Sequence, residues 1–266
     1  MKNAASITIA SAVIGAVALS AGYFAGQKGS VASPSEQAAS IAVPISSEAI
    51  EGVVRDYLLQ NPELLIEVQT ALETKQQAEA QEQVRQILAA NKDMLFDPAY
   101  DAVFGNPNGD VTVVEFFDYN CGYCKRAFPD MQAIIKNDPN VRFVMKEFPI
   151  LGPDSVRAHI VAQAFKALMP EKYADYHQAL MTAQSRSTEE SAIAEAVKMG
   201  VDEARLREKM KDPALADAFQ NSYQLARKLN INGTPSYIVG EELIPGAIGV
   251  DGLVERIAAA REAKQG

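Results

Sequence analysis

The spacing of apolar residues changes several times along the 266-residue chain, and each spacing predicts a different element. A run of β-branched and aromatic residues over 111–117 is typical of a buried strand. Apolar residues then recur at helical spacing from Ala127 to Ile135, until turn-forming residues at 137–140 end this helix. The remaining strands and the terminal helix are expected at 141–146, at 236–240, at 242–245 and from residue 250 onward.

Between the strands at 141–146 and 236–240 the pattern predicts several consecutive helices. They fill the region 154–229, with breaks near Pro170, Gly200 and Pro213. Strands that alternate with helices pack in layers around one sheet, so residues 97–266 predict an α/β domain. This stretch is long enough to form one hydrophobic core.

Residues 46–96 show a different pattern. An apolar stripe at helical spacing begins at Ile50, and Asn61-Pro62 is typical of a second helix start. Residues 73–83 are polar on every side, which predicts a solvent-bridging helix or a flexible rod. The segment is too small to bury its stripes by itself, so either the rest of the chain or other copies of it must cover them. The long polar spacer favours other copies, and we expect an oligomerisation segment.

The first 26 residues have the composition of an export signal. Lys2 precedes an uncharged, largely apolar stretch, and small residues just before Ala21 are typical of a cleavage site. The stretch is also long enough to remain as an N-terminal membrane anchor. Both alternatives export the rest of the chain. Residues 27–45 contain Gly, Ser and Pro and predict a linker.

Cys121 and Cys124 are the only cysteines, and they lie where the strand at 111–117 meets the following helix. Unpaired N–H groups and the positive dipole end favour a thiolate at a helix N-terminus. We therefore expect Cys121 to be the nucleophile and Cys124, one turn further on, to be the resolving thiol. A structural disulfide would close too short a loop to stabilise the fold much. Zinc is disfavoured because His159 and His177 fit no zinc-finger spacing.

A second motif, Gly233-Thr234-Pro235, precedes the strand expected at 236–240. Proline is tolerated at the first position of a strand, and X-Pro is the only bond that readily adopts the cis form. By itself, this motif is weak evidence for a redox site. Combined with an upstream Cys-x-x-Cys, it becomes specific for a redox site.

Three motifs together resemble the DsbA family of thioredoxin-fold proteins, and most closely its ScsC-type branch. They are Glu-Phe-Phe-Asp-Tyr-Asn-Cys-Gly-Tyr-Cys-Lys (115–125), Lys-Glu-Phe-Pro-Ile-Leu-Gly (146–152) and Gly-Thr-Pro-Ser-Tyr (233–237). The resemblance covers residues 97–266. It implies a thioredoxin-like fold with a helical insertion at about 154–229, preceded by an N-terminal α-helical segment, and activity as a periplasmic thiol-disulfide oxidoreductase.

The resemblance also implies roles for particular residues. Cys121 and Cys124 match the redox pair, whereas Thr234 and Pro235 match a cis-proline loop that holds the substrate backbone. Glu115 matches a buried acid that assists proton movement. The alternative for Glu115 is an ordinary strand-end carboxylate, but a charge among Val and Phe side chains is costly unless it is used.

The dipeptide between the cysteines, Gly122-Tyr123, departs from the Pro-His of the family's best-known oxidases. Tyrosine brings no positive charge, so we expect a less favoured thiolate and a less oxidising disulfide. Lys125 and Arg126 could compensate in part, although we expect them to form a solvated face. The pair therefore suits disulfide shuffling better than pure oxidation.

The composition of the chain disfavours some classes of binding partner and cofactor. The formal net charge of −9 disfavours binding to nucleic acid and to anionic membrane surfaces. The sequence contains no P-loop, dinucleotide fingerprint or metal cluster, so we expect no cofactor other than the redox-active disulfide Cys121–Cys124. His159 and His177 fall in predicted helices and are expected to be ordinary helix residues.

The expected function is that of a disulfide isomerase or reductase acting on cysteine-containing exported proteins in the periplasm. One alternative is a DsbA-like oxidase that introduces disulfides, and another is a non-enzymatic envelope binding protein on a thioredoxin fold. A membrane thiol-disulfide partner, DsbD-like or DsbB-like, would restore the redox state. Likeness to ScsC-type proteins implies a homo-oligomer, a trimer, formed through the N-terminal helical segment.

Overall fold

The computed structural model describes residues 46–95 and 101–264. The chain divides into two compact units, 1–60 and 61–266. In the first unit the described element is helix α1 (Ser47–Gln60), which buries no residue. The predicted export signal at 1–26 and the predicted linker at 27–45 lie outside the described residues.

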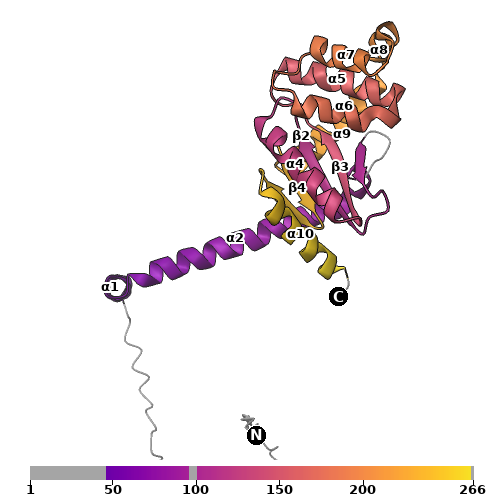
Figure 1. Ribbon diagram of the computed structural model, residues 1–266. Helices are drawn as coiled ribbons and strands as arrows, with labels where there is room; N and C mark the ends of the chain where they lie inside the picture. Colours follow the sequence, from indigo (N-terminus) through magenta and orange to yellow (C-terminus); the bar gives the residue numbers. More distant parts are fainter. Residues whose placement is uncertain (1–45, 96–100, 265–266) are drawn as a thin grey trace, which may run out of the picture. The chain divides into compact units, whose positions relative to one another are not determined.

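The larger unit is built on a five-stranded sheet in the order β1-β3-β2-β4-β5 (Figure 1). Its strands are β1 (Ala102–Gly105), β2 (Val111–Phe117), β3 (Val141–Glu147), β4 (Ser236–Val239) and β5 (Glu242–Pro245). The central strands β2 and β3 are parallel, and the other neighbours are antiparallel. This arrangement confirms the predicted α/β class.

Two details of the sheet differ from the sequence expectation. Strand β1 was not predicted, because four residues that are only partly buried show too little periodicity to reveal a strand. Strand β4 ends at Val239, one residue earlier than expected. Gly240 has a positive φ of 61°, which glycine adopts without steric strain, and it turns the chain into β5.

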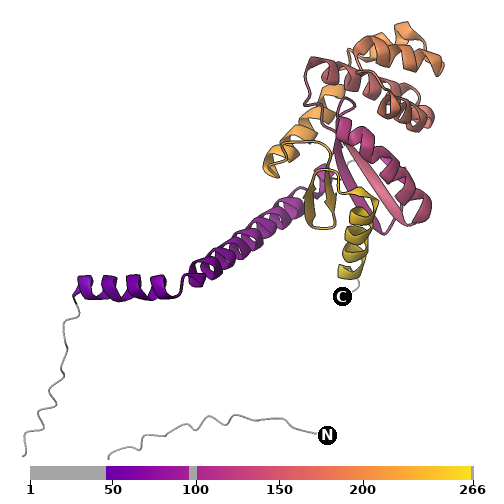
Figure 2. The same ribbon diagram turned by 60° about the vertical axis from the view of Figure 1, so that its left-hand side comes forward.

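Helix α4 connects the two parallel strands, and a set of helices separates β3 from β4. The elements are α4 (Gly122–Asn137), α5 (Pro153–Leu168), the 3₁₀ turn η1 (Pro170–Lys172), α6 (Tyr173–Thr182), α7 (Glu189–Lys198), α8 (Glu203–Lys209), α9 (Ala214–Lys228) and the terminal α10 (Gly249–Ala263). We call α5 to α9 the helical insertion. Figures 1 and 2 show α5 to α8 gathered beyond one end of the sheet, whereas α4 and α10 lie along it.

The two faces of the sheet have separate cores. Val113 and Phe117 of β2 belong to the core that α4, α10 and much of the insertion complete. Val114 and Phe116 point to the opposite face, since successive strand residues alternate, and they pack with residues of α9. Glu115 therefore lies on the same face of β2 as Val113 and Phe117, beneath α4.

The long helix α2 (Glu63–Ala90) and the short α3 (Lys92–Leu95) precede the sheet. Leu88 and Leu95 are buried in the core on the α9 side of the sheet, so the last turns of α2 are part of this fold. Leu88 is the one buried residue of α2. Among the helices of the described residues, none combines the length and the apolar composition that crossing a membrane requires.

Candidate active site

The Cys-x-x-Cys motif lies where β2 ends and α4 begins. Cys121 is the N-cap of α4 and has extended backbone angles. Its N–H donates to the carbonyl of Asp118 at 2.9 Å, and its own carbonyl accepts from the N–H of Lys125 at 3.0 Å. Cys121 is 6% exposed and Cys124 is fully buried. The first thiol is thus the more accessible of the two.

The surroundings of the two thiols make them chemically different. Hydrogen bonding from the Cys124 side chain, supported by backbone N–H groups of Tyr123 and Cys124, lowers the pKa of Cys121 to about 5 against an opposing effect of burial. Burial, reinforced by the neighbouring Cys121, raises the pKa of Cys124 above its ordinary value. At neutral pH the pair therefore holds a nucleophilic thiolate at Cys121 and one proton on Cys124.

The cis-proline motif meets this pair directly. The Thr234–Pro235 peptide bond is cis. The sulfur of Cys121 lies 3.1 Å from the carbonyl oxygen of Thr234, which accepts a hydrogen bond from Cys121 when that thiol is protonated. The two motifs, 113 residues apart in the chain, thus form one site. Ser236 closes the loop by donating its hydroxyl to the carbonyl of Gly233 at 2.8 Å.

Glu115 is buried below the thiols, at 2% exposure. In the sheet it is paired with Tyr237 of β4 on one side and with Met145 of β3 on the other. Burial, followed by the negative charges of Cys121 and Asp130, raises its pKa to about 8. The carboxyl group is therefore mostly protonated at neutral pH, and it can exchange a proton with a reacting thiol.

The sequence of this region matches a known family. The family described as DSBA-like thioredoxin domain matches residues 112–258. The chain belongs to this family. The N-terminal domain of the copper resistance protein ScsC additionally matches residues 48–79, which agrees with the ScsC-type branch. The predicted thioredoxin-like fold and the family resemblance are both confirmed.

Solved structures extend this likeness. A thioredoxin-like oxidoreductase from Silicibacter pomeroyi DSS-3 is 42% identical, with a TM-score of 0.61 over 65% of this chain and 98% of that one. The catalytic domain of Proteus mirabilis ScsC is 30% identical, with a TM-score of 0.61 over 67% and 98% of the two chains.

Curated relatives include a Na(+)/H(+) antiporter NhaA 1 from Salinispora arenicola, which is 26% identical over 62% of this chain. The match spans only 25% of that antiporter's length. The chain therefore spans about a quarter of that antiporter's length, and the match carries no antiporter activity over to this chain.

The dipeptide of this DsbA-like site faces solvent. Tyr123 is 62% exposed, and the guanidinium of Arg126 lies 4.3 Å from the centre of its ring. Arg126 is exposed as expected. The expectation of a solvated face is wrong for Lys125, which is partly buried and donates to the carbonyl of Ala183 at 2.6 Å. Its side chain ties α4 to the loop after α6, a tertiary contact that helical periodicity does not reveal.

The two histidines also differ from the sequence expectation. His159 and His177 are fully buried and belong to a polar cluster behind the Cys-x-x-Cys. His159 accepts a hydrogen bond from the N–H of Tyr119 at 3.1 Å and bonds Glu147 at 2.8 Å. One signal in the sequence could have placed it. His159 shares a helical stripe with Ser155 and Ala162, and such a stripe on α5 is buried.

No group of three or more His, Cys, Asp or Glu side chains in the described ranges is arranged to hold a metal ion. The residues that the sequence assigned to the redox site, Cys121, Cys124, Thr234, Pro235 and Glu115, lie together. Gly122 and Tyr123 form their solvent-facing edge.

Proposed function

We propose that the protein is a periplasmic thiol-disulfide exchange enzyme that isomerises or reduces disulfides in exported proteins. The observation that carries thiol-disulfide exchange is the pairing of a low-pKa Cys121 with a protonated, buried Cys124 beside the Thr234–Pro235 loop, and the N-terminal helices carry the choice of isomerase or reductase. Membership of a thiol-disulfide oxidoreductase family supports the reaction type.

The exchange proceeds in two balanced steps. The Cys121 thiolate attacks one sulfur of a substrate disulfide, a new mixed disulfide forms, and the other substrate sulfur leaves as a thiolate. In isomerisation a second substrate thiolate then attacks the mixed disulfide and releases Cys121. In reduction Cys124 attacks Cys121 instead, so the substrate gains two electrons and the enzyme is left with a Cys121–Cys124 disulfide.

Glu115 would act in the reductive step. Cys124 must lose its proton before it attacks, and burial disfavours the free thiolate. A carboxyl group with a pKa of about 8 is close to neutrality and accepts that proton when it is ionised. Substrate backbone would lie along the Thr234–Pro235 loop, next to the sulfur that attacks it.

The oxidase alternative has an observation of its own. A stabilised Cys121 thiolate favours the dithiol form and so makes the disulfide more oxidising. Tyr123 brings no charge, so hydrogen-bond donors supply the stabilisation here, and the expectation of a thiolate less favoured than beside a Pro-His dipeptide stays a prediction. We retain isomerase or reductase as the proposal because of the N-terminal helices.

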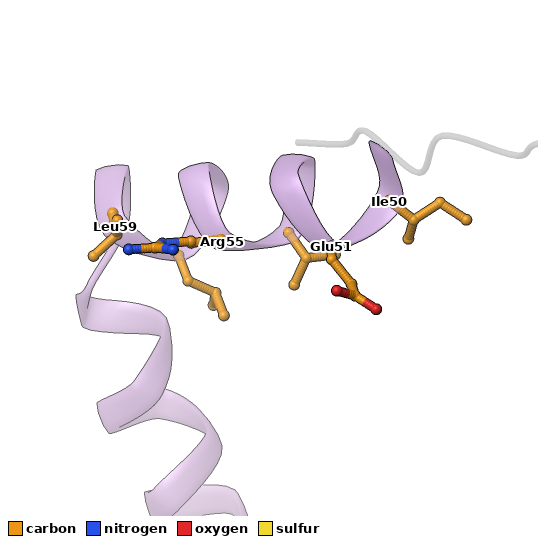
Figure 3. Close-up of a pocket in the computed structure, with 6 residues that line it drawn as sticks. Ile50, Glu51, Arg55 and Leu59 are labelled. Carbon is orange, nitrogen blue, oxygen red and sulfur yellow. The ribbon is translucent and has the colours of Figure 1, made fainter. Parts of the chain in front are cut away.

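Helix α1 carries an apolar face that the described residues leave open. Val53 and Leu59 are 70% and 69% exposed. Figure 3 shows Ile50, Glu51, Arg55 and Leu59 along one side of the helix, where they line a shallow hollow together with neighbouring apolar residues. We propose that copies of this segment cover one another, in a trimer as in ScsC-type proteins, and the match of the ScsC N-terminal domain to residues 48–79 supports this.

Several oligomerised dithiols would hold a misfolded chain between them and would suit isomerisation. Partners would be cysteine-containing exported proteins and a membrane thiol-disulfide protein, DsbD-like, that keeps the pair reduced. A DsbB-like partner belongs to the oxidase alternative. The non-enzymatic envelope binding protein is the remaining alternative, and it requires no thiol chemistry.

The deciding experiment is refolding of a scrambled multi-disulfide protein by the chain without its predicted export signal. We compare it with Cys121→Ser and with Val54→Glu, which places a charge on the α1 face. Recovery that requires Cys121 and falls in a dissociated Val54→Glu protein supports an oligomeric isomerase. Rapid oxidation of reduced substrate by a dissociated protein would favour the oxidase, and no thiol chemistry at all would favour the binding protein.

A further inference from the structure

A cluster of polar side chains lies fully buried behind the redox pair. It joins Tyr119, in the turn before Cys121, to Glu147 at the end of β3 and to His159 of α5. Tyr173 and His177 of α6 complete it. None of these residues touches a cysteine in the contacts described above, so the exchange mechanism does not use them directly.

The hydrogen bonds of the cluster run in one direction. Tyr173 donates its hydroxyl to Glu147 at 3.0 Å, so its oxygen can only accept from Tyr119, 3.1 Å away. The Tyr119 hydroxyl has then used its hydrogen, so it can only accept a hydrogen bond from Nδ1 of His177, 3.0 Å away. His177 must therefore carry its hydrogen on Nδ1. Burial lowers the pKa of His177 to about 3, which keeps it neutral.

His159 has the same tautomer for a different reason. Its Nε2 lies 3.1 Å from the N–H of Tyr119 and must offer a lone pair to accept that bond. The hydrogen therefore resides on Nδ1, which donates to the second oxygen of Glu147 at 2.8 Å. The imidazole thus joins a main-chain N–H of the active-site turn to a carboxylate of the sheet.

Tyr119 is held at both ends by this cluster. His159 fixes its main-chain N–H, and Tyr173 and His177 fix its hydroxyl group. The carbonyl of the preceding Asp118 accepts from the N–H of Cys121, so residues 118–121 form one hydrogen-bonded turn. Any shift of Tyr119 is therefore transmitted to the sulfur-bearing residue.

We propose that His159 is a positioning residue that, through the Tyr119 N–H, holds the turn in which Cys121 faces the N-terminus of α4. The helical insertion is thereby part of the redox site, because it supplies the group that orients the nucleophile. This inference rests on the proposed function, since it gives His159 a part in the exchange.

Tyr176 offers a matched control. It is also fully buried in the insertion, and its hydroxyl donates to the carbonyl of Ala192 at 2.9 Å. Tyr176→Phe removes one buried hydrogen bond inside the insertion without touching the turn. His159→Phe removes the acceptor for Tyr119, whereas His159→Gln keeps a carbonyl oxygen that can accept the same N–H.

The test measures the pKa of Cys121 from thiolate absorbance in the reduced protein, together with thermal unfolding. We expect His159→Phe to raise this pKa by about one unit, because the N–H groups around the sulfur lose their alignment. His159→Gln should restore about half of that shift or more. Tyr176→Phe should lower the melting temperature without moving the pKa. If His159→Phe and Tyr176→Phe both destabilise the fold and leave the pKa of Cys121 unchanged, the positioning role is wrong.

A second measurement needs no variant. The chain has only two histidines, so ¹⁵N NMR of the wild-type imidazoles gives two readily assigned spectra. Both should show a protonated Nδ1 and an unprotonated Nε2 at neutral pH, and a protonated Nε2 on His159 would overturn the inference. Wild-type refolding activity is scored separately, so failure of the proposed function is distinguishable from failure of the positioning role.

Discussion

The N-terminal helices and the helical insertion both carry apolar residues at helical spacing, but they bury very different numbers of side chains. Helix α5 of the insertion buries eight side chains, among them Phe165 and Val161. Helix α1 buries none, and the 28 residues of α2 bury only Leu88. Leu65, Ile66 and Val68 of α2 are each more than half exposed.

The difference shows that an amphipathic pattern predicts a helix but not its partner. The stripe of α5 is covered by other elements of the same fold, whereas the stripes of α1 and α2 are left open by the described residues. Burying one large apolar side chain stabilises a fold by about 1.5 to 3 kcal/mol. The exposed stripes of α1 and α2 would gain this stabilisation if further copies covered them, as proposed above.

The largest expected effect tests this contrast between helices directly. Phe165→Ala in α5 removes a fully buried ring that stacks on Tyr176, with 4.3 Å between ring centres. It should reduce the free energy of unfolding of the redox domain by about 3 to 5 kcal/mol. Leu65→Ala, on the open face of α2, should change it by less than about 0.5 kcal/mol in protein dissociated by Val54→Glu, where further copies do not cover this face. Urea denaturation measures both, and equal losses would mean that the α2 face is buried as well.

The second prediction concerns the buried charge of the redox domain. The raised pKa of Glu115 contributes stability below its ordinary value near 4.5, and this contribution is lost as the pH rises toward 8. Glu115→Gln removes this pH-dependent loss and should stabilise the reduced protein by about 3 kcal/mol at pH 7 and by almost nothing at pH 4. Glu208→Gln removes an exposed carboxylate that pairs with Lys211, and as the control it should change stability by less than about 1 kcal/mol at both pH values. A gain that is equal at both pH values would contradict the raised pKa.

The third prediction separates chemistry from assembly. Because the pKa of Cys121 is about 5, its reaction with a small disulfide should be nearly constant above pH 6 and fall about fivefold between pH 5 and pH 4. Val54→Glu on α1 should leave this profile unchanged, since the thiolate is stabilised within the other unit. A midpoint near the ordinary thiol value of 9 would refute the stabilised thiolate.

The smallest expected effect compares two neighbouring cations. Lys125 bonds a carbonyl of the insertion, so Lys125→Met should reduce stability by about 1 kcal/mol. Arg126→Gln removes only an exposed contact over Tyr123 and should change stability by less than about 0.5 kcal/mol. Thermal unfolding distinguishes them. A larger loss of stability for Arg126→Gln than for Lys125→Met would contradict the assignment of the insertion contact to Lys125.

Much of the fold could be predicted from local patterns. The strand at 111–117, the helix after it, the strand expected at 141–146 and the restart of the helix after Asn61-Pro62 all follow from the spacing of apolar residues and from helix-start signals. Strand β1 escaped because it is short and partly exposed. The contact of Lys125 was not predicted because its partner, Ala183, belongs to a loop that is distant in the sequence.

The sequence by itself determined the redox dithiol, its place at a helix start and the proline loop that accompanies it, since these depend on residue type and on spacing within a few positions. Only the tertiary structure decided that Thr234 meets Cys121, that Glu115 is buried below Cys124, and that His159 holds Tyr119. Burial and hydrogen-bond partners depend on elements that are far apart in the chain. The spacing of apolar residues within one helix or strand does not identify those partners.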